Sequence, residues 1–208
     1  ATAALSAPVP RSRDRERLRL QPTGALTTWY DDGGAAVYWS ALTEKGPADF
    51  DKLERLASVD SLLRDITLSN PLIVQAYLNT HDSLNRIWPW MDAAAVYDPR
   101  MHIPDFNFYY EADATHNPSR SVVWTDAYVD PAGQGWLVSA IAPVYRGDFL
   151  EAVVGADVTV DRIVADVLGR EIPWRGFLIL IGKSGTLLAL PPEGERLFNL
   201  RELKAHEY

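Results

Sequence analysis

Aromatic and acidic side chains gather in the middle of the chain, and they are the residues best suited to chemistry. Residues 88–145 hold half of the chain's aromatic side chains, interleaved with Asn107, Asn117, Asp126 and Asp130. Small-molecule sites combine aromatic walls with a few convergent polar groups. The cluster therefore predicts a ligand pocket, with a large aromatic core as the alternative.

Two carboxylates in this part of the chain stand out by their position in expected strands. Side chains alternate between the faces of a strand, so Trp124, Asp126 and Tyr128 would share one face. An acid between two aromatic rings is costly in a packed core unless it is paired, so this face should line a polar cavity or the sheet surface. Asp157, at the end of an apolar strand, raises the same question; the alternative is that it caps the helix expected to start near Thr159.

The sequence lacks the residue spacing of common phosphate-binding, hydrolase and metal-binding motifs. Gly182-Lys183-Ser184 follows Gly176 after five residues, whereas a phosphate loop needs four and a following helix, so a hairpin turn is the better interpretation. The G-x-S-x-G elbow of serine hydrolases does not occur. Histidines 81, 102 and 116 each have a carboxylate nearby, but no H-x-x-x-H pair exists. We predict no metal site and no cofactor.

Paired carboxylates leave one catalytic alternative open. Asp126 with Asp157 or Glu111 could serve a glycoside hydrolase, whose reaction needs two acids that flank the scissile bond. Nothing in the spacing of these acids favours that pairing. The sequence therefore predicts a chain that is not an enzyme.

Composition excludes several classes of protein. The net charge of the 208 residues is -8, and acids dilute the one dense basic stretch, residues 11–19, so we predict no nucleic-acid partner. The absence of cysteine excludes a disulfide framework and a cysteine nucleophile. The longest apolar run, residues 177–181, is far shorter than the roughly 20 residues that span a bilayer. Residues 1–20 lack the apolar segment of a signal peptide.

Hydrophobic spacing indicates the elements that position the cluster. Apolar residues recur at helical intervals over residues 47–68 and 160–168, with Thr159 as the N-cap of the second helix. A short helix is expected over residues 106–114. Strands are expected over 26–30, 35–40, 72–79, 84–88, 122–128, 136–145, 149–156, 177–181 and 186–190. This order indicates an α+β fold with a meandering antiparallel sheet.

Three blocks of the sequence resemble, in order, the double Cache (dCache) sensor domains of bacterial receptors. Residues 106–112 (FNFYYEA) look like the family's R-x-W-Y-x-x-A segment. Residues 124–130 (WTDAYVD) are similar to its t-x-x-Y-x-D strand. Residues 141–145 (IAPVY) and 152–157 (AVVGAD) are similar to its paired p-i-y and G-v-v-G-x-D strands. The resemblance covers about residues 71–190.

This resemblance implies a PAS-like antiparallel sheet behind a long N-terminal helix. It also implies a small-molecule pocket in a membrane-distal module. The expected parts are a lead-in with a short hairpin (1–45), the membrane-distal Cache module (46–170) and the start of a membrane-proximal module (171–208). Residues 1–45 do not look like the long helix.

The resemblance and the strand argument together give a set of candidate site residues. The ligand-binding candidates are Tyr109, Tyr110, Trp124, Asp126, Tyr128, Asp157 and Asn107. Asn107 stands where amino-acid-binding members have an Arg that holds the carboxylate, and Ala112 stands where they place an Asp that takes the amino group. We therefore expect a small-molecule ligand other than a free amino acid.

The sequence thus predicts the extracytoplasmic sensor domain of a bacterial inner-membrane receptor. The parent protein would be membrane-anchored and dimeric, and of the histidine kinase, chemoreceptor or cyclase type. The alternative is a structural or dimerisation module of such a receptor, whose packed interior would leave no cavity near Tyr110 and Tyr128. A carboxylate-dependent hydrolase is the weaker alternative.

Overall fold

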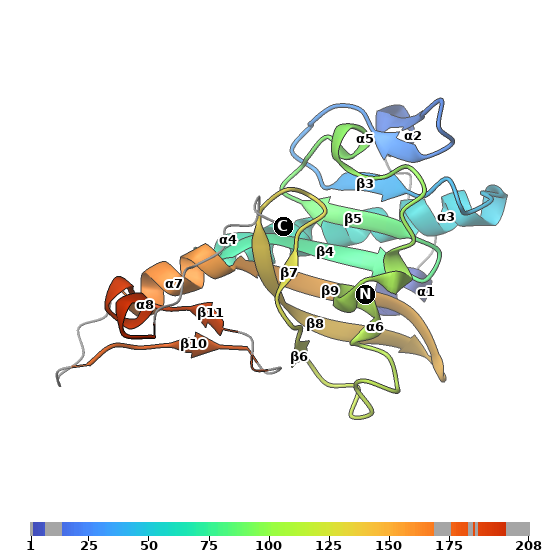
Figure 1. The fold of residues 1–208 in the computed structure, drawn as a ribbon. Coiled ribbons are helices and arrows are strands. Elements are labelled where there is room, and N and C mark those ends of the chain that lie inside the picture. Colours follow the sequence, from blue (N-terminus) through green and yellow to red (C-terminus); the bar gives the residue numbers. More distant parts are fainter. Residues whose placement is uncertain (1, 7–13, 169–175, 183–184, 186, 199–208) are drawn as a thin grey trace.

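A computed structural model describes residues 2–6, 14–168, 176–182, 185 and 187–198 of the chain. Within these residues a nine-stranded antiparallel sheet forms the centre, in the order β1-β2-β3-β5-β4-β9-β8-β6, and β7 also pairs with β8 (Figure 1). The strands of this sheet are β1 (Leu18–Leu20), β2 (Leu26–Thr28), β3 (Ala36–Trp39), β4 (Ile73–Thr80), β5 (Leu84–Trp88), β6 (Val123–Trp124), β7 (Tyr128–Val129), β8 (Trp136–Arg146) and β9 (Phe149–Thr159). The α+β class expected from the sequence is confirmed.

Helices and 3₁₀ turns connect and flank these strands. They are α1 (Thr2–Ser6), α2 (Asp14–Arg17), α3 (Pro47–Leu56), a 3₁₀ turn (Ala57–Val59), α4 (Asp60–Ser69), α5 (Ala93–Val96), a 3₁₀ turn (Ile103–Asp105), α6 (Asn107–Tyr110), α7 (Val160–Leu168) and α8 (Pro192–Phe198). In the described part of the chain, no helix is long and apolar enough to cross a membrane.

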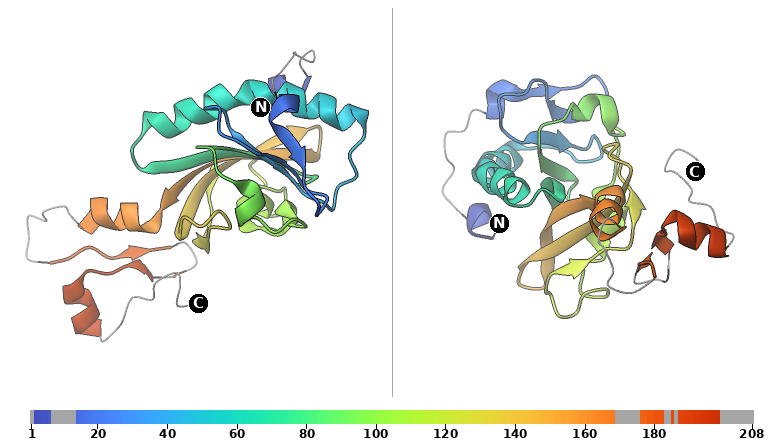
Figure 2. Two further views of the ribbon diagram at one scale, coloured as in Figure 1. Left: turned by 90° about the horizontal axis from the view of Figure 1, so that it is seen from above. Right: turned by 90° about the vertical axis from the view of Figure 1, so that its left-hand side faces the viewer.

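Helices α3 and α4 lie against one face of the sheet, as Figure 2 shows from above. The single helix expected over residues 47–68 is interrupted by the 3₁₀ turn, and Asp60 follows directly. Its carboxylate accepts hydrogen bonds from Arg86 Nε (2.8 Å) and Nη2 (2.7 Å), and Arg86 on β5 is fully buried. This ion pair fixes the joint between the two helices to the sheet.

The strands carry different side chains on their two faces because side chains alternate along a strand. On β4, Ala76 and Leu78 pack toward the helix layer, while Tyr77 faces the other side. On β3, Val37 and Tyr38 divide in the same way. The helix layer therefore covers an apolar core, and the opposite face holds a second, aromatic-rich core.

Loops and short elements cover this second face. The chain from β5 to β8 contributes α5, α6, β6 and β7, and these lie on the side of the sheet away from α3 and α4 (Figure 2). The hairpin of the expected lead-in is continuous with the sheet, since β3 pairs with β5.

The strand expected over residues 122–128 is wrong as one continuous element. It forms two short strands, β6 and β7, and both pair with β8. Between them, Thr125 donates its backbone N–H to the Ser139 carbonyl (2.9 Å) and accepts from the Ser139 N–H through its hydroxyl (3.0 Å). This interruption breaks the alternation, so Trp124 is exposed while Tyr128 faces the interior.

The second long helix and the final hairpin are confirmed in the described residues. Thr159 caps α7, because its hydroxyl accepts a hydrogen bond from the Arg162 N–H (3.2 Å). Strands β10 (Leu180–Ile181) and β11 (Leu187–Ala189) pair antiparallel. Their expected turn residues Lys183 and Ser184 lie outside the described residues.

Candidate functional site

A small cavity of about 20 Å³ lies on the face of the sheet opposite α3 and α4, and it opens in part to solvent. Strands β4, β5 and β9 form its floor, while α6, β7 and the loops after β5 form its cover. Its lining residues are Gln75, Tyr77, Asn79, Asn85, Ile87, Tyr97, Met101, Ile103, Phe108, Tyr128, Asp130, Pro131 and Asp157. The set combines aromatic walls with two acids and three amides, as expected of a small-molecule site.

Asp157 is the most completely buried acid of the cavity. It faces inward because β9 alternates, with Gly155 and Asp157 on the cavity face. Its Oδ1 accepts from Ser139 Oγ (2.6 Å) and from the Tyr128 hydroxyl (3.4 Å), and its Oδ2 accepts from Gln75 Nε2 (2.7 Å). Three neutral donors thus hold this carboxylate in place, and none of them supplies a positive charge.

Asp130 is the second acid, and it also shapes the turn that closes the cavity. Its carboxylate accepts backbone hydrogen bonds from Ala132 (3.0 Å) and Gln134 (3.2 Å). The turn needs Gly133, whose φ of +87° is costly for other residues. Gln75 Nε2 lies 3.4 Å from Asp130 Oδ2, so one amide bridges both acids.

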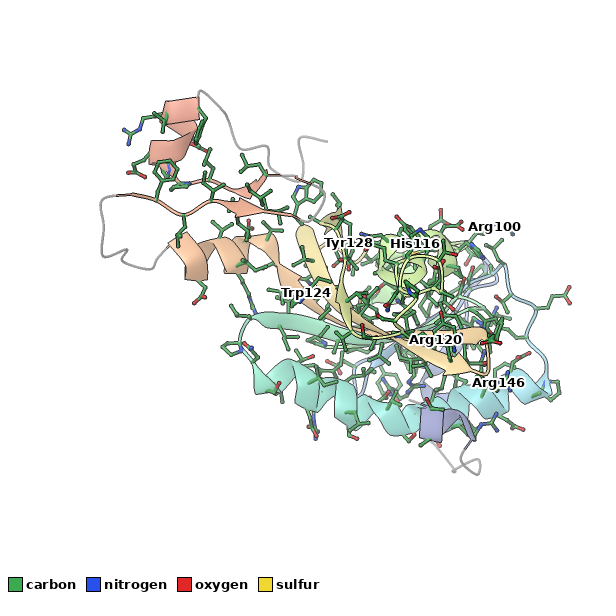
Figure 3. All side chains as sticks on the ribbon, turned by 90° about the horizontal axis from the view of Figure 1, so that it is seen from below. Arg100, His116, Arg120, Trp124, Tyr128 and Arg146 are labelled. Carbon is green, nitrogen blue, oxygen red and sulfur yellow. The ribbon has the colours of Figure 1, made fainter. Side chains whose placement is uncertain are left out.

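The pKa values of both acids are raised because burial removes both carboxyl groups from water. Burial raises the pKa of Asp157 to about 7, and the charge of Asp130 adds to this rise, while hydrogen bonds from Ser139 and Gln75 oppose it. Burial also raises the pKa of Asp130, against the backbone donors of its turn. Among the described residues, neither acid has an ion-pair partner, and Arg120 and Arg146 lie toward the β8–β9 turn, away from Tyr128 (Figure 3). The site is therefore suited to a cation.

The far end of the cavity is polar but uncharged. Asn79 on β4 and Asn85 on β5 are direct cross-strand partners, and Asn85 Nδ2 donates to Asn79 Oδ1 (2.7 Å). Between the two ends, the Tyr77 ring lies over Gly155, where a Cβ would meet Tyr77 Cζ at 2.1 Å. The absence of a side chain at Gly155 therefore makes room for the ring that forms the cavity floor.

The structure brings two of the seven residues predicted from the sequence into the cavity. Tyr128 and Asp157 line it and contact each other through the Tyr128 hydroxyl. Their role in ligand binding stays a prediction.

The other five candidates lie outside the cavity lining. Tyr109 is buried, and its hydroxyl donates to the Leu150 carbonyl (3.1 Å). Tyr110 is 38% exposed and Trp124 is 54% exposed. Asn107 Nδ2 donates to the backbone carbonyl of Asp126 (3.0 Å), so these two residues connect α6 to the segment between β6 and β7.

Sequence reasoning missed Gln75 and did not single out Asp130. Asp130 is named there only as a polar member of the aromatic cluster and as the last residue of the Y-x-D pattern, and that pattern is the signal for its place in the cavity. Gln75 is the one polar residue near the start of an apolar strand, and its importance depends on a contact with Asp157 across 82 residues.

Comparisons with known proteins show what the chain is similar to in sequence and in fold. No family model matches the chain. The methyl-accepting chemotaxis protein McpC of Bacillus subtilis is 27% identical over 129 residues, which are 62% of this chain and 19% of McpC. A second such protein, PctB of Pseudomonas aeruginosa, is 24% identical over 140 residues. The chain spans about a fifth of the length of these curated relatives.

Solved structures give the same fold. The ligand-binding domain of PctB in complex with L-Gln matches with a TM-score of 0.50 and 23% identity, over 65% of this chain and 52% of that domain. The ligand-binding domain of the Pseudomonas fluorescens chemoreceptor CtaA in complex with L-serine matches with a TM-score of 0.53 and 20% identity, over 66% and 56%.

These matches correct one prediction. The expectation of a ligand other than a free amino acid is contradicted, because the similar domains were solved with L-Gln, L-Arg and L-serine. Ala112 stands where the resemblance places the acid that takes an amino group. The structure instead brings Asp130 and Asp157 together in the cavity.

The predicted resemblance and the predicted PAS-like Cache fold are confirmed by the same matches, and the sensor role and extracytoplasmic location agree with them. In fold, the chain is similar to the ligand-binding domains of the bacterial chemoreceptors PctB and CtaA.

Proposed function

We propose that this chain is the ligand-binding part of an extracytoplasmic sensor and that it recognises a small molecule through a primary ammonium group. The observation that carries the proposal is the pair of buried acids, Asp130 and Asp157, which share one cavity with no ion-pair partner among the described residues. Burying a charge is costly unless it is paired. A cationic ligand would supply the missing charge.

Amino acids are the first candidates. The similar domains of PctB and CtaA were solved with amino acids, and an α-amino group carries the positive charge that the two acids lack. Tyr128 and Phe108, whose ring centroids are 5.3 Å apart, form an aromatic wall that can also contact a cation or an apolar side chain.

Binding would act as a signal by favouring one conformation of the domain. Asp130 belongs to the 130–135 turn and Asp157 to the central sheet, so a ligand held by both acids ties the cover to the floor. The proposal gives the chain no catalytic role. The parent protein would be a membrane-anchored, dimeric receptor of the chemoreceptor type.

Thermal shift of the purified domain against amino acids and primary amines tests the proposal. A ligand at 100 times its Kd stabilises a protein by about 2.7 kcal/mol, which is about 5–10 °C in Tm for a domain of this size. The shift should vanish in Asp157→Asn and Asp130→Asn variants. It should persist in Asp148→Asn, which removes an acid whose side chain is 99% exposed. The absence of any shift in the wild-type domain would refute the proposal and favour a structural module.

A further inference from the structure

The far end of the cavity carries a polar group that the ammonium site leaves unexplained. Asn79 and Asn85 are 2% and 4% exposed, and both line the cavity. Asn85 Nδ2 donates to Asn79 Oδ1. Among the described residues, the buried Asn85 Oδ1 has no hydrogen-bond partner. Buried polar atoms are almost always paired, so an orphaned acceptor calls for an explanation.

The chemistry of this atom defines what could complete it. A carbonyl oxygen only accepts, so the missing partner is a hydrogen-bond donor. A carboxylate has no proton to offer at neutral pH, whereas a hydroxyl, a carboxamide N–H₂ or an ammonium group does. The far end therefore favours a ligand that ends in a donor.

The distance between the two ends follows from the strand register. Asp157 pairs with Gln75, and Asn85 pairs with Asn79, four residues further along β4. At roughly 3.3 Å per residue the two levels are about 13 Å apart. The ammonium nitrogen and the donor atom of the ligand would each lie about 3 Å from the protein group that they contact. About 7 Å then remains between these two ligand atoms, which corresponds to an extended spacer of about five carbons.

The walls between the two ends suit such a spacer. Ile87 on the floor is apolar, and so are Met101, Ile103 and Phe108 on the cover. An alkyl chain would be removed from water along this stretch, which stabilises the complex through the hydrophobic effect.

We infer that the cavity binds ligands with two polar ends: an ammonium group at Asp130 and Asp157, and a hydrogen-bond donor at Asn85, joined by an apolar spacer. Amino acids with a donor at the end of the side chain and ω-functionalised amines both meet this description. The inference rests on the proposed ammonium site and specifies the other half of the same ligand.

Matched pairs of amines test the inference in isothermal titration calorimetry. For each spacer of three to seven carbons, an amino alcohol is compared with the alkylamine in which a methyl group replaces the hydroxyl. The wild-type domain should bind the amino alcohol about fivefold more tightly at the best length, which corresponds to one neutral hydrogen bond. Asn85→Leu should remove this preference. Asn117→Leu, which removes a buried amide outside the cavity, should retain it.

A second variant keeps the inference testable if Asn85→Leu does not fold. Asn85→Asp keeps an acceptor and adds a negative charge, so it should favour a diamine over the amino alcohol of the same length. Equal binding of both members of every pair to the wild-type domain would overturn the inference while the ammonium site stands. Loss of all binding in Asp157→Asn supports the ammonium site independently. If neither amines nor amino acids bind the wild-type domain, the proposed function and the inference both fail.

Discussion

Replacement of Asp157 by Asn should stabilise the ligand-free domain at neutral pH while it abolishes the response to ligand. Burial raises the pKa of this carboxyl to about 7, so the folded state disfavours its ionised form. The unfolded chain ionises it near 3.8. Asparagine has a similar shape and carries no charge, and its carbonyl can still accept a hydrogen bond from Ser139 or Gln75.

The magnitude follows from the linkage between protons and folding. A pKa raised in the folded state costs nothing below the unfolded pKa, and the cost grows as pH rises from about 3.8 to about 7. At 1.36 kcal/mol per pKa unit, the full cost above pH 7 is about 4 kcal/mol, and at pH 4.5 it is about 1 kcal/mol. For a domain of this size, 4 kcal/mol is about 8–16 °C in Tm.

Thermal melts of the wild type and Asp157→Asn at pH 4.5, 6 and 8 measure the effect. The variant should gain stability over the wild type as pH rises and should show no ligand-dependent shift at any pH. Asp148→Asn serves as the control, because that side chain is 99% exposed. A variant that is no more stable than the wild type at pH 8, or a difference that is the same at pH 4.5 and 8, would refute the reasoning.

Three further results are expected. Ammonium ligands need the ionised form of Asp157, so calorimetric affinity should fall by about tenfold per pH unit below about pH 7 and level off above it, and a flat profile would contradict the ammonium site. Tyr128→Phe removes the hydroxyl that lies 2.7 Å from Ser139 Oγ. In a urea titration this variant should show a free energy of unfolding that is lower by about 1 kcal/mol. An unchanged free energy of unfolding would mean that the hydroxyl is solvated in the folded state. Gly155→Ala places a Cβ against the Tyr77 ring and should destabilise the domain by about 1–3 kcal/mol in the same titration and weaken ligand binding, whereas unaltered affinity would show that the ring does not shape the cavity.

The strands and long helices could be predicted because their signals are local. Alternating apolar residues marked β4, β5, β8 and β9, and the helical spacing marked α7 with its cap at Thr159. The prediction of one strand over residues 122–128 was wrong, because the Thr125 hydroxyl accepts a hydrogen bond from the Ser139 N–H and the strand is interrupted there. That contact joins residues 14 positions apart, so no local pattern reveals it.

The site was less predictable because its geometry depends on contacts between distant residues. Tyr128 and Asp157, which the resemblance implies as pocket residues, line the cavity, and their role in ligand binding stays a prediction. Helix α6 is only one turn long, and sequence alone could not fix which of its aromatic residues faces inward. It is Phe108 that lines the cavity, while Tyr109 packs beside β9 and Tyr110 faces solvent.

Strand β5 joins the two faces of the sheet within two consecutive residues. Asn85 lines the cavity, and the next residue, Arg86, holds Asp60 at the joint of α3 and α4 on the opposite face. One peptide unit therefore separates the cavity-lining Asn85 from the ion pair at the helix joint. The backbone of β5 thus links the cavity face of the sheet directly to the helices that cover its far side.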